Sequence, residues 1–272
     1  MSENIRAPQM NDIVASPLIT VSFRRSVTTP DIDLCEIKEG SGDTLEVFEL
    51  LSGVPYLNAG DVTTFLSGAA GTFKRIWDQV GYLDPAARQF FQNTEANRPL
   101  YVASGINGKV SARSGTDKVL ASQFDFAITD TEATFFCVAS NDAGQTGDAT
   151  LFTNTANMAI DDSFALTFDG NNVLLRITDS TGGTDNTSSY AITAAPHLFR
   201  VVCDGIDNIK LYVDNVLQES KTVGNGFLCK IQTPELMEDF DGLFSELVAW
   251  DRILTSAEVT RVEADMNTYF GI

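Results

Sequence analysis

The segment HLFRVVCDGIDNIKLYVDNVLQES, residues 197–220, decides the fold class. It contains three runs rich in Val, Ile, Leu or Phe; Asp204-Gly205 separates the first two, and Asp214-Asn215 separates the last two. Short runs of this composition are typical of strands, and Asp, Asn and Gly favour the tight turns that join neighbouring antiparallel strands. The segment therefore predicts three strands linked by hairpins.

The same pattern extends over much of the chain. Short apolar runs bounded by Asp, Asn, Gly or Ser recur at 133–140 (ATFFCVAS), 162–170 (DSFALTFDG), 172–179 (NVLLRITD) and 242–250 (GLFSELVAW). Short polar links such as Asp169–Asn172 favour hairpins over helical crossovers. The polar, Gly-rich tract Asp179–Tyr190 predicts a surface loop. The predicted fold class is all-β and antiparallel.

Helix is predicted in only a few places. Near the C-terminus, Thr255 or Ser256 can cap a helix with Glu258 in its first turn, followed by an apolar stripe of Val259, Val262, Met266 and Tyr269. This short C-terminal helix should pack on the sandwich through that stripe. A second helical stretch is expected over Ala59–Leu66.

The first 20 residues differ from the remainder of the chain. They carry two prolines and scattered single apolar residues, which predicts an extended N-terminal arm over 1–20 ahead of one domain over 21–272. Two alternatives stay open: a disordered tail, or a segment that orders on a partner subunit.

Charge and cysteine usage exclude several classes of protein. Eighteen Lys and Arg against 37 Asp and Glu give a net charge of −19, which repels nucleic acid and anionic lipid. No apolar run reaches the roughly 20 residues of a membrane span, and no signal-peptide pattern opens the chain. We therefore expect that the protein is synthesised in a cytosol and does not insert into a membrane. The four cysteines form no C-x-x-C pair and are predicted to be reduced core residues: Cys35, Cys137, Cys203 and Cys229.

The residues also resemble a known family. Pro196–Ile272 is similar to the paired strands, closing strand and final helix of concanavalin A-like (laminin-G-like) jelly-roll domains. Upstream, SFRRSVTTPDIDLCEI, FLSGAAGTFKRIWDQVGY and NRPLYVASGINGKVSARSGTDKVLAS resemble the arabinofuranosidase-like variant found in phage structural proteins. The resemblance implies a concanavalin A-like antiparallel β-sandwich.

One motif of that variant bears on ligand binding. Where the family has Trp-Tyr-Asp-Gln-Ser-Gly, this chain has Ile76-Trp77-Asp78-Gln79-Val80-Gly81, with the tryptophan moved by one position. The resemblance implies a candidate ligand-binding set of Trp77, Asp78 and Gln79. A core position is the alternative for Trp77, and Trp250 is expected in the core.

Catalysis would need a pair of carboxylates about 5 Å apart or wider on a sheet face. The chain offers several strand glutamates but no E-x-D-x-x-E pattern, and the predicted set of catalytic residues is empty; the glutamates considered are Glu46, Glu49, Glu132, Glu219 and Glu246. The single histidine, His197, is interpreted as a strand-entry residue. Gly105–Lys109 superficially resembles a phosphate loop, but a hairpin turn explains it better.

Calcium is the one cofactor considered. Carboxylates near predicted loops could coordinate it through hard oxygen ligands, and the candidate set is Asp161, Asp162, Asp179 and Asp185. No D-x-D-x-D-G spacing exists, so solvated turn carboxylates remain the alternative reading.

These observations lead to a functional hypothesis. The chain is predicted to be a non-enzymatic structural protein of a phage virion, a fibre, spike or decoration subunit on the capsid or tail surface, which adheres to host-surface glycan. Its expected partners are other virion proteins through the arm and further copies of itself, for example in a trimer, after assembly in the host cytoplasm. The alternatives are a glycoside hydrolase of arabinofuranosidase type and a purely structural cement protein.

Overall fold

The computed structural model of the chain describes residues 14, 17–24, 32–40, 45–50, 56–80, 89–122, 132–142, 149–155, 162–178, 184–186, 189–204, 208–223, 229, 231 and 233–272. Over these ranges it is an all-β protein whose strands all pair antiparallel, with a C-terminal helix, which confirms the predicted β-sandwich. No described helix is long and apolar enough to cross a membrane.

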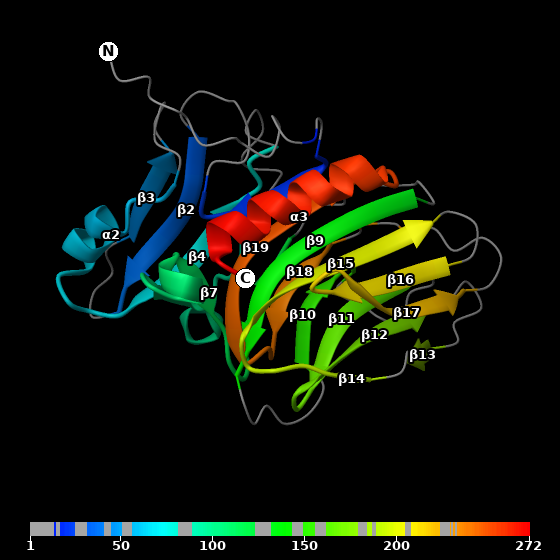
Figure 1. Cartoon of the computed structure of the whole chain (residues 1–272). Coiled ribbons are helices and arrows are strands. Elements are labelled where there is room, and N and C mark those ends of the chain that lie inside the picture. The colour runs from blue at the N-terminus through cyan, green and yellow to red at the C-terminus, as the bar shows by residue number, and fades with distance from the viewer. Residues whose placement is uncertain are drawn as a thin grey trace, which may run out of the picture.

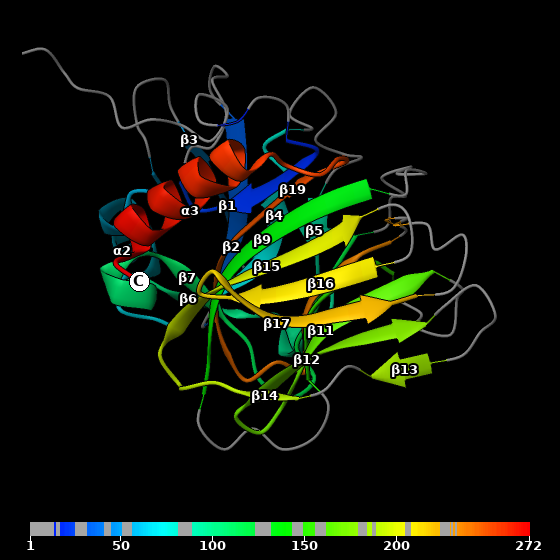
Figure 2. The same cartoon turned by 45° about the vertical axis from the view of Figure 1, so that its right-hand side comes forward.

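Two sheets form the sandwich (Figures 1 and 2). The first, called the covered sheet because α3 packs on it, runs in the order β1 (Ile19–Ser22), β19 (Gly242–Trp250), β9 (Glu132–Asn141), β15 (Pro196–Asp204), β16 (Asn208–Val213) and β17 (Val216–Thr222). The second, the opposite sheet, runs in the order β5 (Gln89–Phe91), β8 (Leu120–Ala121), β18 (Glu235–Glu238), β10 (Ala149–Thr153), β11 (Ser163–Asp169) and β12 (Asn172–Thr178), with β13 (Thr184–Asn186) and β14 (Tyr190–Ala191) beside β12.

A smaller group of strands lies at one end of the sandwich (Figure 1). There β2 (Ile32–Glu39) pairs with β3 (Leu45–Leu50) and with β4 (Gly71–Trp77), which in turn pairs with β5. The hairpin of β6 (Leu100–Val102) and β7 (Ser111–Arg113) joins β4 to β19, and a 3-10 turn, η2 (Ile106–Gly108), connects its strands. A second such turn, η1, covers Glu95–Asn97. Gly105–Lys109 is thus part of a hairpin connection, as predicted.

Two hydrophobic cores explain why β9 has apolar residues at the consecutive positions 135–139. Phe135 points into the core between the sheets, where its ring centroid lies 5.2 Å from that of Phe164. The next residue, Phe136, belongs to a second core under α3, 6.0 Å from the ring of Trp250. A strand buried on both faces needs apolar residues at every position instead of at alternate ones. Trp250 is therefore a core residue, as expected.

The α-helices α2 and α3 of the described part of the chain begin where their sequences predict. In α3 (Ser256–Phe270), the Thr255 side chain accepts from Glu258 N, and the Glu258 carboxylate accepts from Thr255 N at 2.9 Å, which makes a capping box. α3 lies along the outer face of the covered sheet (Figure 1) and buries Val262, Met266 and Phe270. The shorter α2 (Ala59–Leu66) is capped by the Asn58 side chain.

The start of the domain lies inside the segment predicted as an arm. Ile19 and Thr20 already belong to β1, opposite Ala249 and Val248 of β19, and Val14 is buried. Sheet pairing therefore begins before residue 21. Residues 1–13 lie outside the described part of the chain, and the division into arm and domain stays a prediction.

The four cysteines are buried and unpaired, as predicted. Burial raises the pKa of the Cys35 and Cys137 thiols, because a thiolate loses its hydration there. His197 is the second residue of β15, which confirms its interpretation as a strand-entry residue. Its Nδ1 lies 2.6 Å from Asp214 Oδ2, and that hydrogen bond raises the pKa of His197 although burial opposes it.

Candidate functional site

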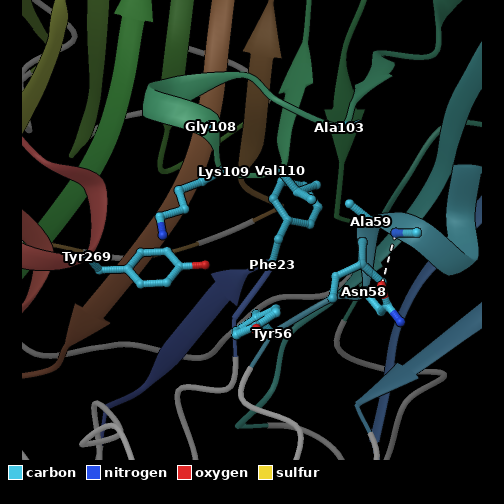
Figure 3. Close-up of a pocket in the computed structure, with 11 residues that line it drawn as sticks. Phe23, Tyr56, Asn58, Ala59, Ala103, Gly108, Lys109, Val110 and Tyr269 are labelled. Carbon is cyan, nitrogen blue, oxygen red and sulfur yellow. Dashed lines mark hydrogen bonds between the residues drawn. The ribbon is translucent and has the colours of Figure 1, made fainter.

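A cavity of about 340 Å³ opens between the start of α2, the end of β1, the η2 turn and the last turn of α3 (Figure 3). Segments far apart in sequence meet there because β1 pairs with β19 while β7 pairs with the first residues of that same strand. Its wall contains aromatic, amide and ammonium groups and no carboxylate; the lining residues are Phe23, Tyr56, Leu57, Asn58, Ala59, Gly60, Ala103, Gly108, Lys109, Val110 and Tyr269.

Three aromatic rings line this cavity. Phe23 is buried and stacks on Phe73 with 5.0 Å between ring centroids, so it forms a rigid apolar wall. Tyr56 is 52% exposed, and its backbone is fixed by an isolated bridge to Arg24. Tyr269 enters from α3 with its hydroxyl directed into the cavity (Figure 3). Flat aromatic faces next to polar groups are suited to the apolar faces and hydroxyls of a sugar ring.

The η2 turn brings Lys109 to the cavity. Gly105 N donates to Lys109 O at 2.8 Å, and Lys109 N donates to Ile106 O at 2.9 Å. Asn107 Nδ2 donates to Phe270 O at 2.7 Å and to Gly271 O, which ties the turn to the end of α3. Lys109 Nζ consequently lies 4.4 Å from the centroid of the Tyr269 ring (Figure 3). Among the described residues, no carboxylate lies within ion-pair distance of Lys109.

A buried ion cluster supports Tyr269. Arg24 lies 2.8 Å from Glu246 and 2.6 Å from Asp265, and its guanidinium carbon is 4.6 Å from the Tyr269 ring centroid. Burial opposes the charge of Arg24, but the two carboxylates outweigh it and raise the pKa of the guanidinium. Burial raises the pKa of Tyr269 to about 12, so its hydroxyl keeps its proton and can donate near neutral pH.

The predicted ligand-binding set lies elsewhere and is buried. Asp78 and Gln79 are each 1% exposed and Trp77 is 7% exposed. Asp78 Oδ1 accepts from Thr20 N at 2.7 Å, and Gln79 Nε2 donates to Ser22 O and Arg24 O. Asp78 and Gln79 thus hydrogen-bond the backbone of β1 and of the residues after it to the end of β4. The three side chains are buried and two of them bond the backbone, and sugar binding by Trp77, Asp78 and Gln79 stays a prediction.

Of the predicted calcium ligands, only Asp162 has a described side chain. It is buried, with a φ of 65°, directly before β11. Asp161 and Asp179 lie outside the described residues, and Asp185 is placed only through the backbone of β13. The described part of the chain contains no group of three or more His, Cys, Asp or Glu suited to a metal ion. Calcium binding therefore stays a prediction.

The glutamates considered for catalysis are scattered. Glu46 and Glu132 are exposed, Glu219 accepts from Tyr190 Oη at 3.0 Å, and Glu246 is fully buried against Arg24. The side chain of Glu49 lies outside the described residues.

Sequence reasoning overlooked the acids of β18. Burial and the neighbouring Glu238 raise the pKa of Glu235 to about 7, while burial and Asp239 raise the pKa of Glu238. No motif marks this pair, because burial of a strand end cannot be read from spacing.

A second groove, of about 370 Å³, lies between the first half of α3 and the strands β15 and β16. Here the charges are paired. Arg200 Nη1 lies 3.1 Å from Glu263 Oε1, and Arg200 also covers the Tyr212 ring at 3.8 Å from its centroid. Lys210 Nζ lies 3.0 Å from Asp204 Oδ2.

The fold has counterparts among solved structures, although no known family model and no curated protein matches the chain. A GH54 α-L-arabinofuranosidase soaked with a cyclic sulfate inhibitor superposes with a TM-score of 0.72 at 14% identity, over 95% of this chain and 65% of that one. An arabinofuranosidase complexed with arabinofuranosyl-α-1,2-xylobiose gives 0.67 at 14% identity, over 95% and 64%. Domain 4 of AbnA, a GH43 extracellular arabinanase from Geobacillus stearothermophilus in complex with arabinotriose, gives 0.51 at 17% identity, over 68% and 91%.

These likenesses establish the fold. The β-sandwich implied by the resemblance is confirmed, and this chain spans 65% of the length of the GH54 structure. Identities of 14–17% do not transfer an activity from one sandwich to another.

Proposed function

We propose that this protein is a carbohydrate-binding β-sandwich without hydrolytic activity, and that the cavity at Tyr56 is its ligand site. The observation that carries the proposal is the composition of this wall, which combines exposed aromatic surface and polar donors with no carboxylate. Hydrolysis of a glycosidic bond needs two acids on either side of it, whereas binding needs only a platform and hydrogen-bond partners.

Three groups of the cavity can act on a sugar. Tyr56 supplies a half-exposed ring for stacking, and the Tyr269 hydroxyl can donate to a sugar oxygen. The Asn58 side chain already accepts from Gly60 N at 3.0 Å through Oδ1, which leaves its amide N–H groups as donors. Solved sandwiches of similar fold are described with an arabinofuranosyl-xylobiose and with arabinotriose, which supports the proposal of a glycan ligand.

A glycan array tests the proposal. The full chain, multimerised to raise avidity, is applied with and without calcium, and both binding and loss of printed glycan are read. Binding without loss supports the proposal, and dependence on calcium would place the predicted loop aspartates in the function. Loss of a glycan, or no binding to any glycan, contradicts it.

Two variants locate the site. Tyr56→Ala removes the exposed ring of the cavity, and Tyr212→Ala removes a ring from the groove beside α3. Stacking on an aromatic ring contributes about 1 kcal/mol, so Tyr56→Ala should weaken glycan binding about fivefold or more while Tyr212→Ala leaves it unchanged. If Tyr212→Ala weakens glycan binding and Tyr56→Ala does not, the ligand site lies in the groove.

A glycoside hydrolase is the second candidate, favoured by the acids of β18. A carboxyl with a pKa of about 7 beside another carboxyl is the arrangement expected of a proton donor and its partner. If hydrolysis is observed, Glu235→Gln should abolish it and Glu46→Gln, at an exposed position, should not. Equal effects of both substitutions would remove this assignment.

We further propose that the chain works as a surface subunit of a phage particle, as its resemblance implies. Four reduced core cysteines suit a protein that folds in a reducing cytoplasm before assembly. Several copies per particle would raise the avidity of a weak site. Immunogold labelling of particles tests this role: surface label that is lost on deleting residues 1–13 supports an anchoring arm, and unlabelled particles contradict the role.

A further inference from the structure

We infer that the cavity at Tyr56 selects an acidic sugar, one that carries a carboxylate, and that Lys109 is the residue that recognises it. This inference rests on the proposed function and adds the chemical class of the ligand. The observation behind it is an ammonium group without a carboxylate partner in a cavity whose described wall contains no carboxylate.

Lys109 differs from four of the other described lysines. Lys38, Lys74 and Lys210 form ion pairs with carboxylates, and Lys118 donates to the carbonyls of Ala96 and Arg98. In a chain with a net charge of −19, a lysine side chain has many carboxylates available. Lys109 instead lies over the Tyr269 ring, with a charged group at the cavity wall.

The turn holds the ammonium group in position. Besides the backbone bonds of the turn, Ser111 Oγ accepts from Ile106 N at 3.0 Å and lies 2.6 Å from Ser245 Oγ of β19. A Cβ on Gly105 would overlap the Ser111 side chain, so this close approach requires glycine. Held at both ends, the turn presents Lys109 with less conformational freedom than an isolated surface lysine has.

The contact with Tyr269 leaves Lys109 able to bind a carboxylate. A cation over a ring face interacts with the ring quadrupole, and an ammonium group keeps N–H donors on its other sides. The Tyr269 hydroxyl, directed into the same cavity, can donate to the ligand beside it (Figure 3). Together the two groups can hold a carboxylate while Tyr56 holds the sugar ring.

The acidic character of the whole protein does not prevent this. At physiological ionic strength, charges are screened over about 8 Å, so a ligand in the cavity responds mainly to its immediate wall. Behind Tyr269, Arg24 is within ion-pair distance of both Glu246 and Asp265, and its positive charge offsets one of those two negative charges.

The test compares matched sugars and matched variants. The probes are an oligogalacturonate and its methyl ester, which has the same rings and linkages without the charge. The proteins are the wild-type chain, Lys109→Gln and Lys210→Gln; the last two have the same net charge, but Lys210 belongs to the other groove. Titration calorimetry at two salt concentrations gives each affinity, and thermal unfolding checks each fold.

We expect wild type and Lys210→Gln to bind the acid about tenfold more tightly than the ester, because a hydrogen bond to a charged group exceeds a neutral one by about that factor. Lys109→Gln should bind both alike, and added salt should reduce only the preference of proteins that retain Lys109. Equal affinity for acid and ester in wild type, with binding weakened in Tyr56→Ala, overturns this inference and leaves the proposed function intact.

Other results are equally decisive. Absence of binding to every glycan on the array contradicts the proposed function itself. A preference for the acid that survives in Lys109→Gln, together with a lowered melting temperature, would show that Lys109 only balances the buried carboxylates, and it overturns the inference.

Discussion

The two concave regions beside α3 use the same kinds of residue in different ways. In the groove along the first half of the helix, Arg200 is paired with Glu263 and Lys210 with Asp204. In the cavity at the last turn, Lys109 contacts only a ring face among the interactions of the described residues, and no carboxylate lines the wall. The comparison teaches that charges in the groove stabilise the fold, whereas the charge in the cavity is available to a ligand.

Removing the buried charge behind the cavity should have the largest effect. Glu246→Gln leaves the buried guanidinium of Arg24 with Asp265 alone, and breaking a buried ion pair costs about 3 kcal/mol or more. Urea unfolding measures the loss, and Glu46→Gln at an exposed position serves as the control. A loss of under about 1 kcal/mol would mean that the cluster does not hold β1, β19 and α3 together.

The groove should respond next. Arg200→Met removes the pair with Glu263 and the cover of the Tyr212 ring, and we expect a loss of about 2 kcal/mol in unfolding free energy. The matched control is Arg261→Met, since Arg261 is exposed and its Nε donates to Ala257 O of its own helix. If both variants lose the same unfolding free energy, the charges of the groove do not stabilise the fold.

The histidine near the groove makes a smaller, pH-dependent contribution. The hydrogen bond with Asp214 raises the pKa of His197, so its stabilisation is complete below the unfolded pKa of about 6.5 and is lost as pH rises through the folded value. His197→Gln should therefore lower the unfolding free energy more at pH 5.5 than at pH 9. The loss at pH 5.5 should be only about 1 kcal/mol, because solvent screens the half-exposed Asp214.

Denaturation curves at the two pH values measure this difference. Asp214→Asn should remove the same pH dependence, and the double variant should add little to either single one. A cost of His197→Gln that is independent of pH would show that packing alone accounts for it.

The cavity lysine should have the smallest effect on stability. Lys109→Gln breaks no ion pair among the described residues, so we expect the unfolding free energy to change by under about 0.5 kcal/mol. Thermal unfolding measures it alongside the sugar titrations. A larger loss of unfolding free energy would mean that the charge of Lys109 stabilises the fold, as the charges of the groove do.

The fold could be predicted because it is encoded locally. Alternation and turn residues in 197–220 predict β15, β16 and β17, and the Thr255 and Glu258 pair predicts the start of α3. Cores follow from composition, since a tryptophan in an apolar run such as Trp250 is buried more often than not.

The site could not be predicted because it is assembled from distant segments. Tyr56, Lys109 and Tyr269 meet only through the pairing of β1 and β7 with β19. Their sequence signals are weak: Tyr269 is one member of the apolar helix stripe, and Lys109 ends a predicted hairpin turn. Conversely, Asp78 and Gln79 are prominent in sequence, but hydrogen bonding to β1 explains their presence.

The pairing of β1 with β19 also constrains how the protein is made. Arg24 and Glu246 are separated by 222 positions, so β1 is synthesised long before the strand that it needs as its partner. Contacts this distant in sequence form slowly, and an unpaired apolar strand is open to aggregation meanwhile. Nascent chains should therefore depend on protection during translation, and the cavity can form only after β19 and α3 have been synthesised.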